Sequence, residues 1–286
     1  MRIGFIGAGK VGCSLGAYFG RIHQVVGYAS FTKESAREAA RLTSSRAYDD
    51  PAALARDCDL LFITTPDGAI ASAWHELREG VGDTGALAGA IVCHCSGSLP
   101  STVLDGADRA GAEAGSFHPL FAISSKQTPA SELSSAFFTF EGTPRACAVL
   151  ESLAEGLGNP HQRIDTDEKV RYHAAAVMAS NHVCALYQLA CEELERCGFS
   201  YEGAAAALAP LFLGNAAHAA AAGPLAALTG PAERGDAATV AAHLAALSGA
   251  SLAAYRALDA ECWGMARARR GEAAPGAPAK NPEKGC

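Results

Sequence analysis

The predicted helix at residues 165–197 carries Lys169, His173, Ser180 and Asn181, and the apolar run Ala174–Met178 lies among them. At about 100° per residue, Lys169, His173 and Ser180 share one stripe of a helix, and Asn181 lies beside it. Such groups cost free energy on an apolar helix unless they are paired or functional. Hydride reduction of a carbonyl leaves negative charge on oxygen, so Lys169 or His173 could supply the cation or proton, with Asn181 orienting the substrate. A surface lysine and a hydrogen-bonded core histidine are the alternative.

Two loops that follow predicted strands offer further polar groups. The first is Ser96-Gly97-Ser98, with hydroxyls and backbone N–H groups, and the second places His118 beside a proline. Ligands of open parallel sheets bind at the carboxyl ends of the strands, so both loops are candidate substrate-binding segments. Farther along, Arg234 could hold a substrate carboxylate.

The chain begins with an apolar run that leads directly into Gly7-x-Gly9-x-x-Gly12, and a helix pattern follows. This context is typical of a dinucleotide-binding turn. Gly7 permits the tight turn, Gly9 lets a pyrophosphate approach the backbone, and Gly12 lets the helix pack closely on the strand. The helix N-terminus then faces the phosphates. The predicted cofactor residues of this loop and of the later strand end are Gly7, Ala8, Gly9, Lys10, Val11, Gly12, Thr65 and Pro66.

The end of the second predicted strand bears on which dinucleotide binds. An acidic residue about 20 positions beyond the glycine loop holds the ribose hydroxyls in NAD-binding versions. This chain has no carboxylate there before Glu34, and offers Ser30, Thr32 and Lys33 instead. These groups could hydrogen-bond and neutralise a 2′-phosphate. We therefore predict NADP over NAD, although a plain solvated turn would also fit these residues.

Strand and helix patterns alternate over the first 160 residues, which predicts a parallel sheet with helices on both faces. After Asn159-Pro160 no convincing strand appears, and helix patterns cover 165–197, 202–222 and 236–266. We predict an α/β fold, with a Rossmann-type doubly wound sheet over 1–159 and an all-α domain over 160–270. The segment 271–286 is rich in Gly, Pro, Ala and Lys, which predicts a disordered tail. The first predicted strand is the apolar run of Ile3, Phe5 and Ile6, and the others are 24–29, 58–65, 90–95, 115–120 and 136–141; the first helices are 34–42 and 69–79.

The composition narrows the class of protein. The 286 residues are 49% hydrophobic and 19% charged, as in a globular protein. The net charge of -7 is spread without long runs, so we expect no nucleic-acid partner. Met1 leads straight into the first strand and leaves no room for a signal peptide, and the ten cysteines then indicate thiols in a reducing cytoplasm. Cys93-His94-Cys95 has no second cluster at zinc-ligand spacing, and neighbouring strand residues point to opposite faces, so we expect no metal site.

The region 203–232 carries no charged residue and is long enough to span a bilayer. It is mostly alanine, which contributes little to insertion, and Pro210 and Gly223-Pro224 interrupt it. We therefore expect no membrane span. Water-facing helices normally carry charges, so closely packed helices that meet another copy in a homodimer are the better interpretation.

These motifs together resemble those of a Rossmann-like family of oxidoreductases of unassigned substrate, whose C-terminal half is similar to the helical domain of 6-phosphogluconate dehydrogenase. The resemblance covers almost the whole chain before the tail. The motifs that carry it are Gly7–Gly12, His94-Cys-Ser-Gly-Ser98, Ser116-Phe-His-Pro-Leu120, Lys169-x-x-x-His173 with Ser180-Asn181, and Gly230-Pro-x-x-Arg-Gly-Asp236.

The wider superfamily includes β-hydroxyacid dehydrogenases, ketopantoate reductase and pyrroline-5-carboxylate reductase. In the hydroxyacid and ketopantoate enzymes a catalytic lysine begins the corresponding helix, and Lys169 matches it, whereas His173 stands where those enzymes have an asparagine. The resemblance implies an NADP-dependent reductase of a small carboxylate-bearing carbonyl compound of the 2-oxo acid type, with ketopantoate as one candidate. Two alternatives remain open: reduction of a cyclic imine of the pyrroline-carboxylate kind, and an NADP-binding sensor or scaffold without catalysis.

Overall fold

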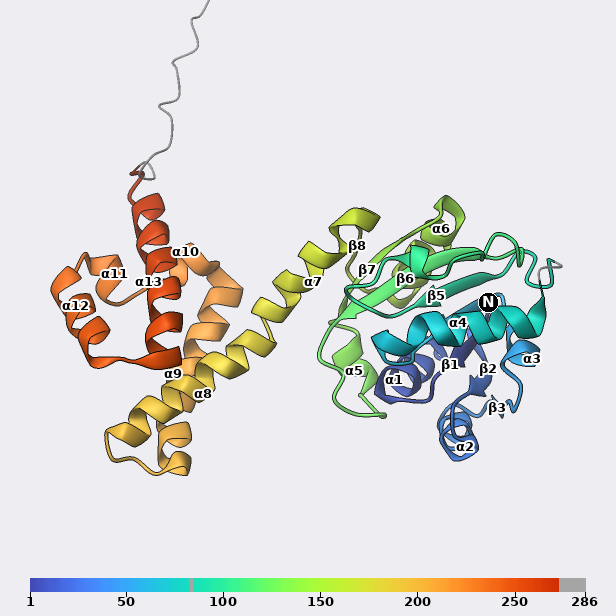
Figure 1. Cartoon of the computed structure of the whole chain (residues 1–286), viewed down its shortest axis with the longest axis horizontal. Coiled ribbons are helices and arrows are strands. Elements are labelled where there is room, and N and C mark those ends of the chain that lie inside the picture. Colours follow the sequence, from blue (N-terminus) through green and yellow to red (C-terminus); the bar gives the residue numbers. More distant parts are fainter. Residues whose placement is uncertain (83–84, 273–286) are drawn as a thin grey trace, which may run out of the picture. The chain divides into compact units, whose positions relative to one another are not determined.

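The computed structural model describes residues 1–82 and 85–272, which form two compact units (Figure 1). The first unit covers residues 1–177 and the second begins at Met178. The first unit therefore extends past the predicted boundary at Asn159–Pro160. The predicted tail at 271–286 lies outside the described residues apart from its first two positions.

An eight-stranded sheet forms the centre of the first unit, in the order β3-β2-β1-β4-β5-β6-β7-β8. Neighbouring strands are parallel except for β6 and β7, which are antiparallel. The chain turns to one side after β1 and to the other after β3, so a topological switch point lies beside β1, where ligands of such sheets bind. The strands are β1 (Arg2–Ile6), β2 (Gln24–Ala29), β3 (Arg46–Ala47), β4 (Leu60–Ile63), β5 (Ile91–His94), β6 (Glu113–Leu120), β7 (Phe137–Gly142) and β8 (His161–Arg163).

Helices cover both faces of this sheet. Phe5 of β1 packs in a core with residues of α1, α2 and α6, and Leu61 of β4 packs in a second core with residues of α3 and α4. The central strands are apolar at successive positions because both of their faces are buried. The helices of this unit are α1 (Lys10–Phe19), α2 (Lys33–Leu42), α3 (Pro51–Arg56), α4 (Asp67–Val81), α5 (Ala130–Leu133), α6 (Pro144–Leu157) and α7 (Lys169–Met178), with 3₁₀ turns η1 (Ser101–Val103) and η2 (Thr166–Glu168).

The predicted fold class, a Rossmann-type sheet followed by a helical region, is confirmed. The expectation that no strand follows Pro160 is wrong, because β8 adds to the edge of the sheet beside β7. Its three residues, His-Gln-Arg, are polar and give no alternating apolar signal. The two-residue strand β3 at the other edge was too short to predict.

The predicted continuous helix over 165–197 is also wrong. It is divided into α7, which ends at Met178, and α8, which begins at Asn181. Ser180, between them, has φ -129° and ψ -82°, and its hydroxyl donates a hydrogen bond to Asn181 Oδ1 at 3.1 Å. Such local bonds compete with the helical pattern. Ser180 therefore does not continue the stripe of Lys169 and His173.

The regular elements in the described part of the second unit are helices (Figure 1). The predicted helix at 202–222 is present, whereas the predicted helix at 236–266 is divided at Leu247-Ser248. Among the described helices, α9 has the length and composition that could cross a membrane, with a mean hydropathy of 1.3. The helices are α8 (Asn181–Arg196), α9 (Tyr201–Ala222), α10 (Pro224–Ala227), α11 (Pro231–Arg234), α12 (Ala237–Ala246) and α13 (Gly249–Arg269).

Candidate active site

The glycine loop between β1 and α1 has three glycines with three different surroundings. Gly7 has φ +109°, and a Cβ there would lie 2.8 Å from the carbonyl carbon of Thr64. A Cβ on Gly12 would collide with the Gly7 carbonyl oxygen, so α1 packs directly on the turn. A Cβ on Gly9 would meet nothing within 4 Å of the protein. Gly9 thus borders open space, which is the cradle that a pyrophosphate requires.

Two further observations fit a dinucleotide at this loop. Gly9 caps α1 without a side-chain hydrogen bond, and the first turn holds no acidic residue, so the helix N-terminus can accept an anion. At the end of β4, the Thr65 hydroxyl is buried and has no hydrogen-bond partner among the described residues. Buried polar groups are normally paired. Thr65 and the adjoining Pro66 follow β4, which pairs with β1, and their contacts with a cofactor stay a prediction.

The segment predicted to hold a 2′-phosphate lies where β2 ends and α2 begins. Thr32 caps α2: its Oγ1 accepts a hydrogen bond from the Ser35 N–H at 3.3 Å. Lys33 Nζ lies 3.0 Å from Asp49 Oδ2, and both side chains are exposed. Ser30 is half-buried between β2 and this helix. A bound phosphate would compete with Asp49 for the exposed lysine.

Lys169, at the start of α7, is 1% exposed. Its Nζ donates hydrogen bonds to the Ser96 carbonyl oxygen and to Ser116 Oγ, each at 2.7 Å. Burial lowers the pKa of Lys169, and the largest opposing influence is the charge of Glu141. The lysine is thus anchored beneath the predicted substrate loop.

Gly97, at the centre of that loop, is packed between two imidazole rings. A Cβ on Gly97 would collide with His173 Cδ2 and would lie 2.9 Å from His118 Nε2. The two rings meet edge to face, with centroids 6.1 Å apart. The structure therefore brings together Ser96, Gly97, His118, Lys169 and His173, which the sequence places in three separate segments.

Tyr172 and Asp67 complete the cluster and were not predicted. The Tyr172 hydroxyl lies 2.7 Å from His118 Nδ1. Asp67, at the start of α4, accepts hydrogen bonds from Ser96 Oγ at 2.7 Å and from Ser98 Oγ at 3.3 Å. Asp67 directly follows the predicted Thr65-Pro66 pair, and Tyr172 adjoins His173, so proximity along the chain was the only available signal.

Two predicted site residues lie in the second unit. Asn181 is the first residue of α8, and Arg234 is the exposed last residue of α11. Asp236 caps α12 by accepting a hydrogen bond from the Thr239 N–H at 3.0 Å. The roles of Asn181 and Arg234 stay predictions.

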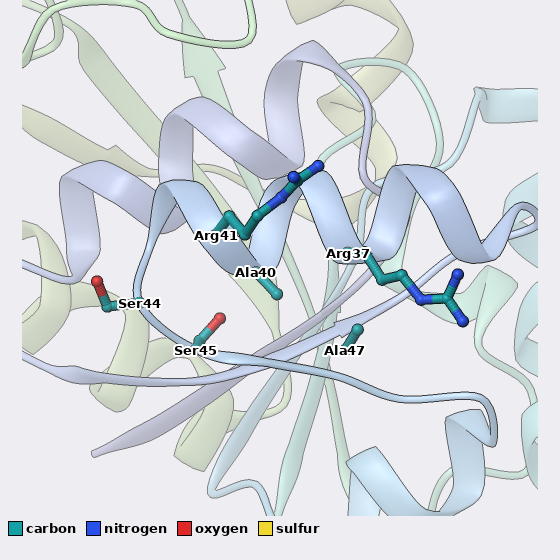
Figure 2. Close-up of a pocket in the computed structure, with 6 residues that line it drawn as sticks. All are labelled: Arg37, Ala40, Arg41, Ser44, Ser45 and Ala47. Carbon is teal, nitrogen blue, oxygen red and sulfur yellow. The ribbon is translucent and has the colours of Figure 1, made fainter.

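A hollow of about 560 Å³ lies at the opposite end of α2 from Lys33 (Figure 2). It contains none of the predicted site residues. It borders the helix C-terminus, whose carbonyl groups disfavour an anion despite two arginines nearby. The hollow is lined by Arg37, Ala40, Arg41, Ser44, Ser45 and Ala47.

Comparisons with known proteins bear on both units. Residues 1–119 match the family model of a Rossmann-like domain. Residues 136–261 match the model of the DUF2520 family, a domain of unknown function. A comparison with curated protein sequences found no match to this chain.

Solved structures share the fold over nearly the whole chain. A candidate NADP oxidoreductase from Bacteroides fragilis is 25% identical, with a TM-score of 0.68, over 92% of this chain and 98% of that one. Protein TM1727 from Thermotoga maritima is 24% identical, with a TM-score of 0.75, over 94% and 99%. A pyrroline carboxylate reductase from Plasmodium falciparum, solved with NADP bound, is 12% identical, with a TM-score of 0.59, over 93% and 98%. The chain thus joins a Rossmann-like domain to a DUF2520 domain, which confirms the predicted family of Rossmann-like oxidoreductases with a helical C-terminal half.

Proposed function

We propose that this protein is an NADP-dependent oxidoreductase that reduces a small carbonyl compound bearing a carboxylate, of the 2-oxo acid type, with ketopantoate as one candidate. The fold shared with a candidate NADP oxidoreductase supports the enzyme class. The observation that carries the proposal is the packing of two histidines and a buried lysine around Gly97. They lie at the carboxyl ends of β5 and β6, on the side of β4 away from the glycine loop.

NADPH bound along the glycine loop would supply the hydride. The open space beside Gly9 would take the pyrophosphate, and Thr65 and Pro66 would border the nicotinamide end. On the second strand, Ser30, Thr32 and Lys33 would meet the 2′-phosphate. These assignments suit the N-terminus of α1, where no side chain caps the helix and the backbone N–H groups can bind an anion.

The protein's own groups would stabilise the charge that develops on the substrate oxygen. Lys169 donates to the Ser96 carbonyl, which polarises the Ser96–Gly97 peptide and makes the Gly97 N–H a stronger donor. None of the hydrogen bonds made by the described residues uses that N–H. His173 flanks the same glycine and could pass a proton to the oxygen, and His118 flanks it as a substrate-binding residue. Burial lowers the pKa of His118 to about 4, so its ring is neutral near pH 7.

Substrate recognition would use the hydroxyls of Ser96 and Ser98 and the guanidinium group of Arg234. A carboxylate pairs well with the guanidinium group of arginine through a bidentate hydrogen bond. Asp67 accepts hydrogen bonds from both serine hydroxyls, and Ser96 Oγ accepts from the Ser98 and Leu99 N–H groups, so these contacts fix the loop. The described cysteines are free thiols, which supports a reducing, cytoplasmic setting.

Reduction of a cyclic imine is the second candidate, because the fold is shared with a pyrroline carboxylate reductase. A protonated imine carries positive charge, so this reaction would depend less on Lys169. The test is a panel of possible substrates, namely 2-oxo acids, ketopantoate and cyclic imines, each assayed by steady-state oxidation of NADPH. Turnover with the 2-oxo acids supports the first candidate, and turnover with imines alone supports the second. NADPH binding without turnover on either class would indicate a sensor.

Replacement of Lys169 tests its part in the chemistry. Lys169→Met keeps the length of the side chain and removes its charge. We expect turnover of a 2-oxo acid to fall about 100-fold or more, with NADPH affinity nearly unchanged. Arg234→Ala is the contrasting variant and should mainly raise KM, as loss of a binding contact does. Near-normal turnover of a folded Lys169→Met variant would leave His173 as the leading proton donor.

A further inference from the structure

A row of three buried polar side chains crosses the middle of the sheet. His94 of β5 is the register partner of Ser116 of β6, and Ser116 is the register partner of Glu141 of β7. The exposed fractions are 0%, 0% and 1%. Register partners in neighbouring strands lie on the same face, so the row interrupts an otherwise apolar surface. A buried carboxylate in such a place requires compensation.

Glu141 obtains that compensation from two segments that are distant in the sequence. Its Oε1 accepts a hydrogen bond from the Ser101 N–H at 2.7 Å, and its Oε2 accepts from Ser101 Oγ at 2.7 Å and from Thr166 Oγ1 at 2.8 Å. Ser101 closes the loop that begins at Ser96. Thr166 begins the 3₁₀ turn that leads directly into Lys169. One carboxylate therefore joins the two segments that carry the candidate site.

Lys169 lies against the same row, since its Nζ donates to Ser116 Oγ. The ammonium group that binds Ser116 and the carboxylate of Glu141, the register partner of Ser116, are thus both buried. The attraction between opposite charges is stronger away from water than at the surface. Loss of either charge would leave the other buried without an opposite charge to balance it, which is costly.

We propose that Glu141 is a positioning residue of the active site: its carboxylate ties the loop at 96–101 to the start of α7 and supplies the negative charge that balances the Lys169 ammonium group. The inference rests on the proposed function for its catalytic readout.

Among the other ionisable groups around Lys169, the thiols and the buried imidazole rings do not replace this charge, and Asp67 raises the pKa of Lys169 less than Glu141 does. Burial raises the pKa of the Cys93 and Cys95 thiols, so both stay neutral. Burial lowers the pKa of His94 and of His118 to about 4, so neither ring is charged near pH 7. Asp67 faces the site from α4 and is bound to Ser96 and Ser98, and His173 faces it from α7.

Glu141→Gln separates charge from geometry. The amide oxygen can accept from the Ser101 N–H, and the hydroxyls of Ser101 and Thr166 can rotate to accept from the amide N–H groups. Only the charge is then lost. Thr166→Val is the complementary variant, because it retains the charge and removes the hydrogen bond to the turn before α7. Glu113→Gln on β6 is the matched control for removal of a carboxylate from the same sheet.

The first measurement is kcat against pH with the best substrate of the panel. In Glu141→Gln the alkaline limb should move to lower pH by about one unit or more, because Lys169 loses its proton more easily without a neighbouring carboxylate. Thr166→Val should lower kcat without moving the limb, and Glu113→Gln should behave as the unaltered protein. A folded Glu141→Gln variant with an unaltered kcat and pH profile would overturn the proposal.

The second measurement does not depend on turnover. The side-chain resonances of Lys169, assigned by comparison with Lys169→Met, are titrated by NMR in the full chain and in Glu141→Gln. A lower midpoint in the variant supports the proposal, and an equal midpoint overturns it. The titration midpoint of Lys169 can fall in Glu141→Gln while no compound of the panel is reduced. In that case the proposed substrate class is wrong, and the proposal that Glu141 balances the charge of Lys169 stands.

Discussion

His94 uses both ring nitrogens within its own loop. Its Nε2 lies 3.1 Å from the Pro100 carbonyl oxygen, and its Nδ1 lies 3.2 Å from the Ser96 nitrogen. The Ser96 N–H can only donate and the Pro100 carbonyl can only accept, so the neutral ring carries its proton on Nε2. Protonation of Nδ1 would break the bond to Ser96. This arrangement holds the loop only while the ring is neutral.

Acid should therefore destabilise the first unit. The pKa of His94 and of His118 falls from 6.5 to about 4 in the folded protein, so the unfolded chain binds more protons between these values. The stability they contribute is complete above about pH 6.5 and is lost as pH falls toward 4. We expect a combined loss on the order of several kcal/mol, measured by urea unfolding across this range.

The matched variants for this acid effect are a double replacement and a surface control. In the double variant His94→Gln with His118→Gln, the free energy of unfolding should change less between pH 6.5 and 4 than in the unaltered protein. His75→Gln should leave it unchanged, because His75 is exposed and pairs with Glu79 on the surface of α4. If the double variant loses stability toward pH 4 as steeply as the unaltered protein, groups other than His94 and His118 cause the loss.

Cofactor choice is a second property at the scale of single residues. Lys33 is exposed and its only partner among the described residues is Asp49. Lys33→Glu removes a cation and repels a 2′-phosphate, so it should narrow or reverse the preference for NADPH over NADH. The measurement is titration of both nucleotides by intrinsic fluorescence. Equal affinities of the unaltered protein for the two would contradict the NADP assignment.

The sequence predicted some site residues and could not predict others. Lys169, His173, Gly97 and His118 stand in short motifs with unusual polarity, so their chemistry is visible before their positions are known. Glu141 stands in a strand pattern like any other polar residue. Its importance depends on register across three strands and on hydrogen bonds to residues that are distant along the chain. No local pattern contains that information.

At the scale of elements, long apolar strands were predicted well and short polar ones were not. The predicted strand at 24–29 coincides with β2, because its apolar side chains are buried between two helical layers. β8 is stabilised by pairing with β7 rather than by its own side chains. The break between α7 and α8 similarly depends on local hydrogen bonds of Ser180 and Asn181, which a helical periodicity does not reveal.

The glycine loop before α1 gives a prediction in which two similar substitutions differ. Gly9→Ala is compatible with the backbone and meets no protein atom, so the fold should be unaffected. The added methyl group should instead occupy the phosphate space and weaken NADPH binding about tenfold or more, which is roughly 1.4 kcal/mol. Calorimetric titration measures this change.

Gly7→Ala is the comparison for Gly9→Ala. At φ +109° and beside the backbone of Thr64, it should lower the thermal stability of the unliganded protein. If Gly9→Ala also destabilised the unliganded protein, or bound NADPH normally, the assignment of the phosphate site to this loop would be wrong.

The second unit, considered as a whole, exposes much apolar surface. On α9, Leu211 is 62% and Leu213 is 63% exposed, and only 6% of its most apolar window is buried. A groove of about 920 Å³ runs between helices of the same unit, and its lining includes Leu186, Leu211 and Leu258. Contiguous apolar patches of this kind mark surfaces that are covered in the working molecule. We propose that a second copy of the chain covers them in a homodimer.

Light scattering at micromolar concentration tests this assembly. The unaltered protein should be a dimer, and Leu211→Gln with Leu258→Gln should shift it toward the monomer, because two large apolar side chains are lost from the contact. Leu42→Gln replaces a partly exposed leucine of α2 and should leave the dimer intact. A monomeric unaltered protein would argue against the homodimer.

The reversed direction of β7 has a consequence for how the chain reaches its native state. β7 meets β6 as the antiparallel pair of the sheet, and its Phe138 and Phe140 alternate with Thr139 and Glu141. A slip of one residue in this pairing would turn Glu141 into the aromatic core and expel two phenylalanines. The misaligned sheet would bury a carboxylate without Ser101 or Thr166 to receive it. The same glutamate therefore discriminates against a competing fold, and selection on folding accuracy alone would retain it.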